Sequence, residues 1–148
     1  AREEMSVAAL EAGIAINNAS VTIVHGMSRP IGANFHVAHG ISNAMLLEKC
    51  MAFALDGAYD RFADLGRATG TADASNDDKT AAEKFLAGLG DICRVCEVPT
   101  LEEYGIDKEK FFSLADKMAD DALASGSPGN TIKKVTKQDV LDIYSQLW

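Results

Sequence analysis

The sequence lacks an excess of positive charge and lacks long apolar runs. Lysine and arginine number 14 against 22 aspartates and glutamates, which gives a net charge of −8. A chain of this charge repels phosphate backbones and anionic lipid surfaces at long range. The longest apolar stretch, residues 44–55, is interrupted by Glu48 and Lys49 and falls short of the roughly 18 consecutive apolar residues of a membrane span. We therefore expect no nucleic acid and no membrane among the partners of this protein.

Cysteine is also scarce, with three residues in 148. An odd number cannot pair completely, and Cys93 and Cys96 lie one helical turn apart, so the sequence argues against a disulfide framework and favours a reducing, cytoplasmic compartment. The chain opens with Ala1-Arg2-Glu3-Glu4, which is charged where a secretory signal is apolar, and it has no initiator methionine. We therefore expect a piece of a longer protein.

Alternating strand patterns are missing, and residues 21–24 are the only β-branched run. Apolar residues recur instead at the three- and four-residue spacing of helices, and 148 residues of 47% hydrophobic content suffice for one domain. The sequence predicts an all-α fold, a bundle of about seven helices over residues 1–148. The expected helices cover residues 5–16, 41–55, 58–68, 76–98, 100–104, 107–122 and 137–148.

Three of these helices carry packing predictions. The apolar face of residues 5–16 predicts a helix docked on the core, and residues 41–55, apolar on nearly every side, predict a central helix buried on most of its circumference. Cys93 and Cys96 have the spacing of zinc and redox motifs, but a second ligand pair and a preceding strand are both absent. Because the two cysteines continue an apolar helix face, we predict that they belong to the core.

All three histidines of the chain, His25, His36 and His39, fall within residues 25–40. A neutral imidazole is a good ligand for Fe(II) or Zn(II), and two histidines on successive elements joined by a glycine-containing turn can converge on one ion. The alternative is a pair of helix-terminal or core histidines that bond to backbone carbonyls. Spacing alone leaves both interpretations open, because His25 and His39 are too far apart to form a short-range ligand motif.

The motifs around these histidines resemble one family. They are Val24-His25-Gly26-Met27, Pro30-Ile31-Gly32-Ala33, His39-Gly40 and Asn43-Ala44-Met45-Leu46-Leu47. Together they resemble the signature of the iron-containing alcohol dehydrogenases. The same family's C-terminal domain is also resembled by the opening Ala1-Arg2-Glu3-Glu4-Met5, the loop Ser125-Gly126-Ser127-Pro128 and the terminal residues 139–144. The resemblance therefore covers nearly the whole chain.

The resemblance implies a two-domain enzyme of dehydroquinate synthase-like architecture, in which an N-terminal α/β domain binds NAD or NADP and a helical domain holds most of a divalent iron site. Residues 1–148 would be the helical metal- and substrate-binding domain, with the N-terminal nucleotide-binding domain absent. His25 and His39 match the last two of four metal ligands, one Asp and three His, and the other two would precede Ala1. The implied cofactors are Fe(II), with Zn(II) as the alternative, and NAD or NADP through the missing domain.

The implied function is that of an alcohol dehydrogenase, which interconverts an alcohol and an aldehyde or ketone by hydride transfer with NAD(P), the metal acting as a Lewis acid. The implied partners are a small-molecule alcohol or aldehyde substrate and, in the full-length enzyme, a second copy in a homodimer. With half of the ligand set, the chain is expected to be inactive alone. Two alternatives stay open: a glycerol dehydrogenase-like or maleylacetate reductase-like oxidoreductase on the same scaffold, and a catalytically silent helical scaffold or oligomerisation domain.

Two further residues, Arg29 and His36, are candidate catalytic residues. Arg29 stands where many family members have another histidine; its guanidinium stays charged and cannot shuttle a proton, but it can hold a carboxylate or phosphate of substrate or cofactor. A structural ion pair with an acidic residue is the alternative for Arg29. His36 lies three residues before His39, and on one helix the two would share a face, which predicts a place for His36 beside a ligand or in the substrate pocket.

Overall fold

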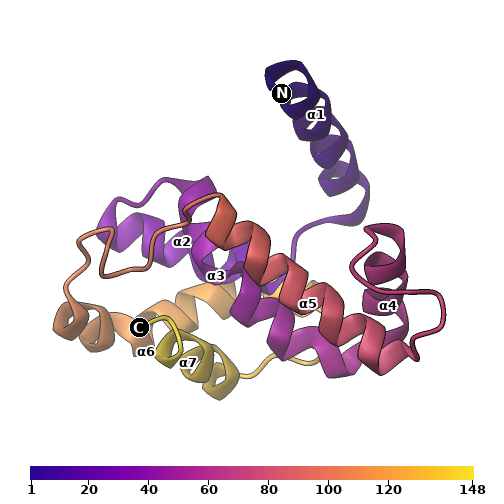
Figure 1. The fold of residues 1–148 in the computed structure, drawn as a ribbon. Helices are drawn as coiled ribbons and strands as arrows, with labels where there is room; N and C mark the ends of the chain where they lie inside the picture. Colours follow the sequence, from indigo (N-terminus) through magenta and orange to yellow (C-terminus); the bar gives the residue numbers. More distant parts are fainter.

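The computed structural model describes residues 1–148, and every regular element in it is a helix (Figure 1). In chain order the elements are α1 (Arg2–Ala19), α2 (Ile23–Phe35), α3 (His39–Ala54), the short 3-10 helix η1 (Leu55–Gly57), α4 (Tyr59–Ala68), α5 (Asp78–Val95), α6 (Lys108–Ala124), the 3-10 helix η2 (Ser127–Asn130) and α7 (Lys137–Ser145). The predicted all-α fold of about seven helices is confirmed, although α2 is not among the predicted ranges and takes the place of the short helix expected over residues 100–104. Residues 100–104, where the sequence predicts a short helix, form only turns, because Gly105 with a φ of 89° ends them at once.

Side-chain caps fix where three of the helices begin. Asp77, Asp107 and Thr136 each accept a hydrogen bond from the backbone N–H three residues later. At α7 the Asp139 carboxylate also accepts from the backbone N–H of Thr136, at 2.8 Å, which completes a capping box. These bonds satisfy donors that have no partner within the helix itself.

The main core holds 18 buried residues, most of them from α2, α3, α6 and α7. Tyr144 lies at its centre, where its ring meets that of Phe111 edge-on at 5.4 Å. Its buried hydroxyl donates to the backbone oxygen of Met27 at 3.0 Å, which meets the need of a buried O–H for a partner. The C-terminal helix α7 is thereby tied to α2, the helix that carries the first histidine.

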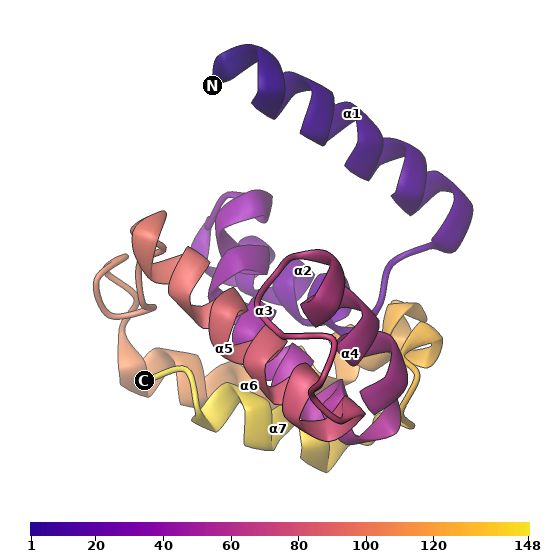
Figure 2. The ribbon, with the colours of Figure 1, turned by 45° about the vertical axis from the view of Figure 1, so that its right-hand side comes forward.

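Helices α4 and α5 pack against each other and form a smaller core with the end of α3 (Figure 2). Their close approach requires a glycine: a Cβ at Gly66 would lie 2.7 Å from the backbone oxygen of Ala81. The C-terminal half of α5 extends beyond α4, so Ile92 is 57% exposed and Cys96 is exposed too. The predicted core position of Cys96 is therefore wrong, while Cys93 is half-buried.

Helix α1 projects away from the body, and none of its residues is buried (Figures 1 and 2). Met5 and Leu10 are 68% and 64% exposed. The prediction that this helix docks on the core is wrong for the described chain, because periodicity identifies an apolar face without identifying what covers it. No single helix is both long and apolar enough to cross a bilayer; α1 and α2 pass that test only as a pair, bent by 108° at the break between them.

Helix α3 is central, as predicted, but it is less buried than predicted. Its fully buried residues form one stripe at four-residue spacing: Ser42, Leu46, Cys50 and Ala54. The residues beside this stripe are half-buried, because α2, α5 and α7 each cover only part of the circumference. One end of the helix, at His39, stays open to solvent.

Candidate metal centre

The structure brings His25 and His39 together at the junction of α2 and α3. His25 lies in the first turn of α2, and His39 is the first residue of α3. Nδ1 of His25 and Nε2 of His39 are 3.1 Å apart, and the ring centroids are 5.0 Å apart at an interplanar angle of 61°. Two histidines that are distant in the sequence thus face each other across a helix corner.

The corner is made by His36, which ends α2 in the left-handed conformation with a φ of 56°. The left-handed region is a common way to stop a helix. Because α2 ends at His36, His36 and His39 do not share a helix face, and the predicted common face is wrong. The exposed His36 makes no hydrogen bond with either member of the histidine pair.

The separation of the two facing nitrogens is compatible with one shared metal ion as well as with a hydrogen bond between the rings. Two nitrogens bound at about 2.1 Å to the same ion, at angles of 90–109°, lie roughly 3.0–3.4 Å apart, and the facing nitrogens here are 3.1 Å apart. Burial lowers the pKa of His25, and the charges of His39 and Arg29 lower it further, so the neutral, metal-binding form of the ring is favoured. No group of three or more potential ligand side chains exists in the chain, so residues 1–148 offer two candidate ligands at this place.

Two polar side chains near His39 have no counterpart in the sequence predictions. The buried Ser28 hydroxyl donates to the backbone oxygen of His25 at 3.2 Å and lies 3.4 Å from Nδ1 of His39. Asn43 Nδ2 lies 3.2 Å from Nε2 of His39, and its buried Oδ1 has no partner. Helical spacing could have found both, because Ser28 is three residues after His25 and Asn43 is four after His39.

Arg29 lies one turn after His25 on α2, and its Nη1 donates to the Ser127 hydroxyl at 3.1 Å. Ser127 is buried in η2, and η2 is pressed against α2 at Gly26. A Cβ at Gly26 would lie 2.7 Å from the Pro128 ring, so this approach requires glycine. The loop at 125–128 therefore packs directly against the histidine segment.

A hollow of about 460 Å³ opens beside the histidine pair, between the end of α1, the start of α2 and α3. His25, Gly40 and Asn43 line it together with apolar side chains such as Leu47 and Met51. Its volume lies within the range of small-molecule sites, and its lining is the usual mixture of apolar wall and a few polar groups.

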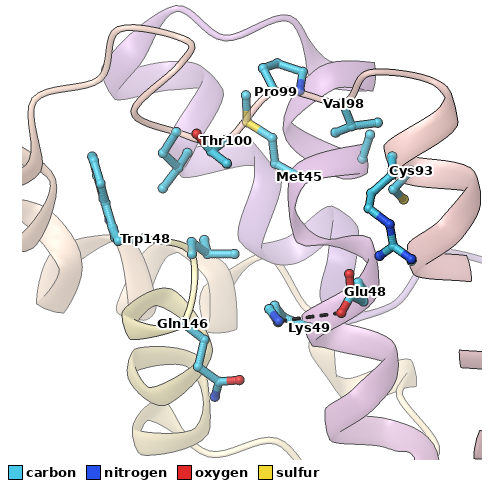
Figure 3. Close-up of a pocket in the computed structure, with 14 residues that line it drawn as sticks. Met45, Glu48, Lys49, Cys93, Val98, Pro99, Thr100, Gln146 and Trp148 are labelled. Atoms are coloured by element: carbon cyan, nitrogen blue, oxygen red, sulfur yellow. Dashed lines mark ion pairs between the residues drawn. The ribbon is translucent and has the colours of Figure 1, made fainter. Parts of the chain in front are cut away.

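A second cavity, of about 260 Å³, lies away from the histidines between α3, the end of α5 and the C-terminus (Figure 3). Cys93 lines it, as do Glu48 and Lys49, which form an ion pair with charged atoms 3.5 Å apart. Burial raises the pKa of the Cys93 thiol, and the Glu48 carboxylate raises it further. A thiol held in its neutral form is a poor metal ligand and nucleophile, which agrees with the structural role predicted for it.

Two solved structures of similar fold are an alcohol oxidoreductase and an alcohol dehydrogenase. A 1,3-propanediol oxidoreductase matches 99% of this chain with a TM-score of 0.91 and 29% identity, over 38% of its own length. The alcohol dehydrogenase from Oenococcus oeni matches 93% of the chain with a TM-score of 0.82 and 28% identity, over 35% of its own length. These similarities define the class, a helical part of alcohol oxidoreductases.

Sequence comparison gives the family. The model of the Fe-containing alcohol dehydrogenase family, C-terminal part, matches residues 1–148, and the chain belongs to this family. Lactaldehyde reductase of Escherichia coli (strain K12) is 28% identical over 100% of the chain and 38% of its own length. 1,3-Propanediol dehydrogenase of Klebsiella pneumoniae is 31% identical over 99% of the chain and 37% of its own length. The chain thus spans little more than a third of these relatives.

Proposed function

We propose that residues 1–148 are the metal- and substrate-binding part of an alcohol dehydrogenase that interconverts a small alcohol and its aldehyde or ketone with NAD or NADP. The observation that carries the proposal is the 3.1 Å separation of the facing nitrogens of His25 and His39, within motifs of a chain that belongs to this family. When bound, the divalent metal supplies Lewis-acid polarisation and the nicotinamide supplies or accepts hydride.

The residues of this chain would hold and orient these groups. His25 and His39 would supply two imidazole ligands, which suit Fe(II) and also Zn(II). Ser28, beside the ring of His39, would hold that ring with its Nδ1–H toward the serine oxygen and its Nε2 lone pair toward the ion. The hollow lined by His25 and Asn43 would leave room beside the ion for the reacting end of the substrate.

The proposal extends to the full-length protein, which would carry the remaining ligands and a nucleotide-binding domain. We infer a homodimer in the cytoplasm. Three free cysteines agree with a reducing compartment.

The test is made on the full-length protein by measuring bound metal and aldehyde reduction together. One Fe(II) per chain and NAD(P)H-dependent reduction of small aldehydes are expected. His25→Ala and His39→Ala should lose both, whereas His36→Ala should keep its metal and serves as the matched histidine control. Zn(II) in place of Fe(II) would favour a glycerol dehydrogenase-like enzyme. A protein without metal and without NAD(P)-dependent activity would instead be a silent helical scaffold, contrary to the proposal.

A further inference from the structure

Arg29 is held beside the histidine pair by contacts outside its own helix. Its Nη1 donates to the hydroxyl of Ser127, which is only 5% exposed. Ser127 is fixed by η2, whose Pro128 ring packs against Gly26 one turn before Arg29. The guanidinium is therefore more restricted than that of a free surface arginine, although the side chain is open to solvent.

The held guanidinium has no acidic partner. The chain has 22 aspartates and glutamates, and Arg67 and Arg94 both pair with aspartates, yet no carboxylate lies within 4.0 Å of Arg29. Ser127 satisfies one of its N–H donors, and arginine offers five in a planar fork that matches carboxylate and phosphate. The structural ion pair that the sequence left open for Arg29 does not form within residues 1–148.

Arg29 differs from other arginines without a carboxylate partner in its position. Arg61 also lacks a carboxylate partner, but it lines a separate hollow beside α4. Arg29 follows His25 by one turn on the same face of α2, which corresponds to about 6 Å along the helix axis. A molecule whose reacting oxygen lies at the histidine pair can therefore reach Arg29 with a group four or five bonds away.

We propose that Arg29 is a specificity-determining residue that binds an anionic group, a carboxylate or a phosphate, carried at the far end of a short aldehyde or alcohol substrate. The inference rests on the proposed function of the histidine pair. The fixed guanidinium would bind both anion oxygens at once and so orient the reacting carbonyl toward the pair. A histidine at this position, which loses its charge near neutral pH, would give little preference for an anionic substrate.

The test compares two aldehydes of equal carbon number on the full-length enzyme, 4-oxobutanoate and butanal, with glyceraldehyde 3-phosphate and glyceraldehyde as the phosphate pair. Wild type should prefer the anionic member of at least one pair in kcat/KM. Arg29→Gln should lower that value about 10- to 100-fold, as expected for loss of a charged hydrogen-bonding partner, and leave the neutral member within about twofold. Arg29→Lys should restore part of the preference, and Arg61→Gln is the control for a change of net charge.

Binding measurements separate the inference from its alternatives. Succinate, which lacks a reducible carbonyl, should bind wild type in a calorimetric titration, and Arg29→Gln should weaken that binding by a similar factor. An unchanged preference, an equal loss for charged and neutral aldehydes, or a change confined to the KM of NAD or NADP would each overturn the assignment, the last by placing the anion on the cofactor. A wild type that reduces butanal without preferring any anionic aldehyde would refute this inference alone, whereas a wild type that reduces no aldehyde would refute the proposed function.

Discussion

Ser28 joins the two histidines without being a ligand. Its hydroxyl donates to the backbone of His25 and is within 3.4 Å of the ring of His39, and it is completely buried. Since the hydroxyl hydrogen is directed to the carbonyl, the serine oxygen is left to accept a hydrogen bond from Nδ1–H of His39. That arrangement favours the tautomer of His39 whose Nε2 carries a lone pair and no proton.

Ser28→Ala is therefore expected to weaken divalent metal binding by the full-length protein about 10-fold or more, measured by calorimetric titration with Zn(II). Ser42→Ala is a closely matched control, because Ser42 is equally buried and also donates to a backbone carbonyl, that of His39, without a bond to a ring nitrogen. Equal losses of affinity in the two variants would show that removal of a buried hydroxyl, and not the tautomer of His39, is responsible.

The sequence predicts the histidine pair better than it predicts what surrounds the pair. His25 and His39 stand out because the three histidines gather in one short segment and because the motifs resemble one family. Ser28 and Asn43 are ordinary helix residues until the crossing of α2 and α3 brings them to a ring nitrogen. The error over His36 comes from the backbone, because a left-handed residue there breaks the helix that the spacing assumes.

At the scale of elements, the cap of α7 connects local sequence to stability. Thr136 Oγ1 donates to the Asp139 carboxylate at 2.6 Å and accepts from the Asp139 backbone N–H. These bonds hold the pKa of Asp139 below its ordinary range. A carboxylate whose pKa is lower in the folded state stabilises the fold above the unfolded-state pKa of about 3.9 and loses that contribution as pH falls through the folded value.

Thr136→Ala is expected to lower the free energy of unfolding by about 1 kcal/mol near neutral pH, measured by urea unfolding. The difference from wild type in the free energy of unfolding should shrink progressively below pH 4 as the Asp139 carboxylate is protonated. Thr136→Ser, which keeps the hydroxyl, should remain close to wild type. A difference that is constant from pH 7 to acid would assign the effect to helix propensity instead of the capping box.

Helix α1 is expected to contribute little to the stability of the rest of the fold. None of its residues is buried, whereas Ser20, just after it, accepts a hydrogen bond from Asn130. A chain of residues 20–148 is therefore expected to unfold within about 2 °C of residues 1–148, since 1 kcal/mol corresponds to roughly 2–8 °C for domains of this size range. Circular dichroism melting curves give the comparison, and a decrease of more than about 5 °C would mean that α1 packs on the body in solution.

Helix α1 also shows which features of an element the sequence predicts and which it does not. The periodicity of residues 5–16 correctly indicates a helix, because local spacing determines helix formation and face. The surface that packs on this face belongs to residues elsewhere, so the local pattern does not predict it. The caps at Asp107 and Thr136 were predictable for the opposite reason, since the whole interaction lies within four residues.

At the scale of the whole molecule, two candidate ligand side chains meet and no third joins them. The isolated residues 1–148 are therefore expected to bind divalent metal only weakly and without selectivity, and to catalyse no NAD(P)-linked alcohol oxidation. Calorimetric titration with Zn(II) should give a dissociation constant far above that of the full-length protein, and His25→Ala with His39→Ala should remove the remaining binding. Turnover of a simple alcohol by the isolated chain would contradict this expectation.

The contact between Gly26 and Pro128 has a consequence for natural variation. A Cβ at position 26 would overlap the proline ring at 2.7 Å, so the two positions constrain each other although they are distant in sequence. Relatives with a bulkier residue at the first position should carry a smaller or displaced one at the second. In such relatives the residue at position 127, and with it Arg29, should also have moved. Substrate preference should then vary together with positions 26 and 128, although neither is proposed to contact the substrate.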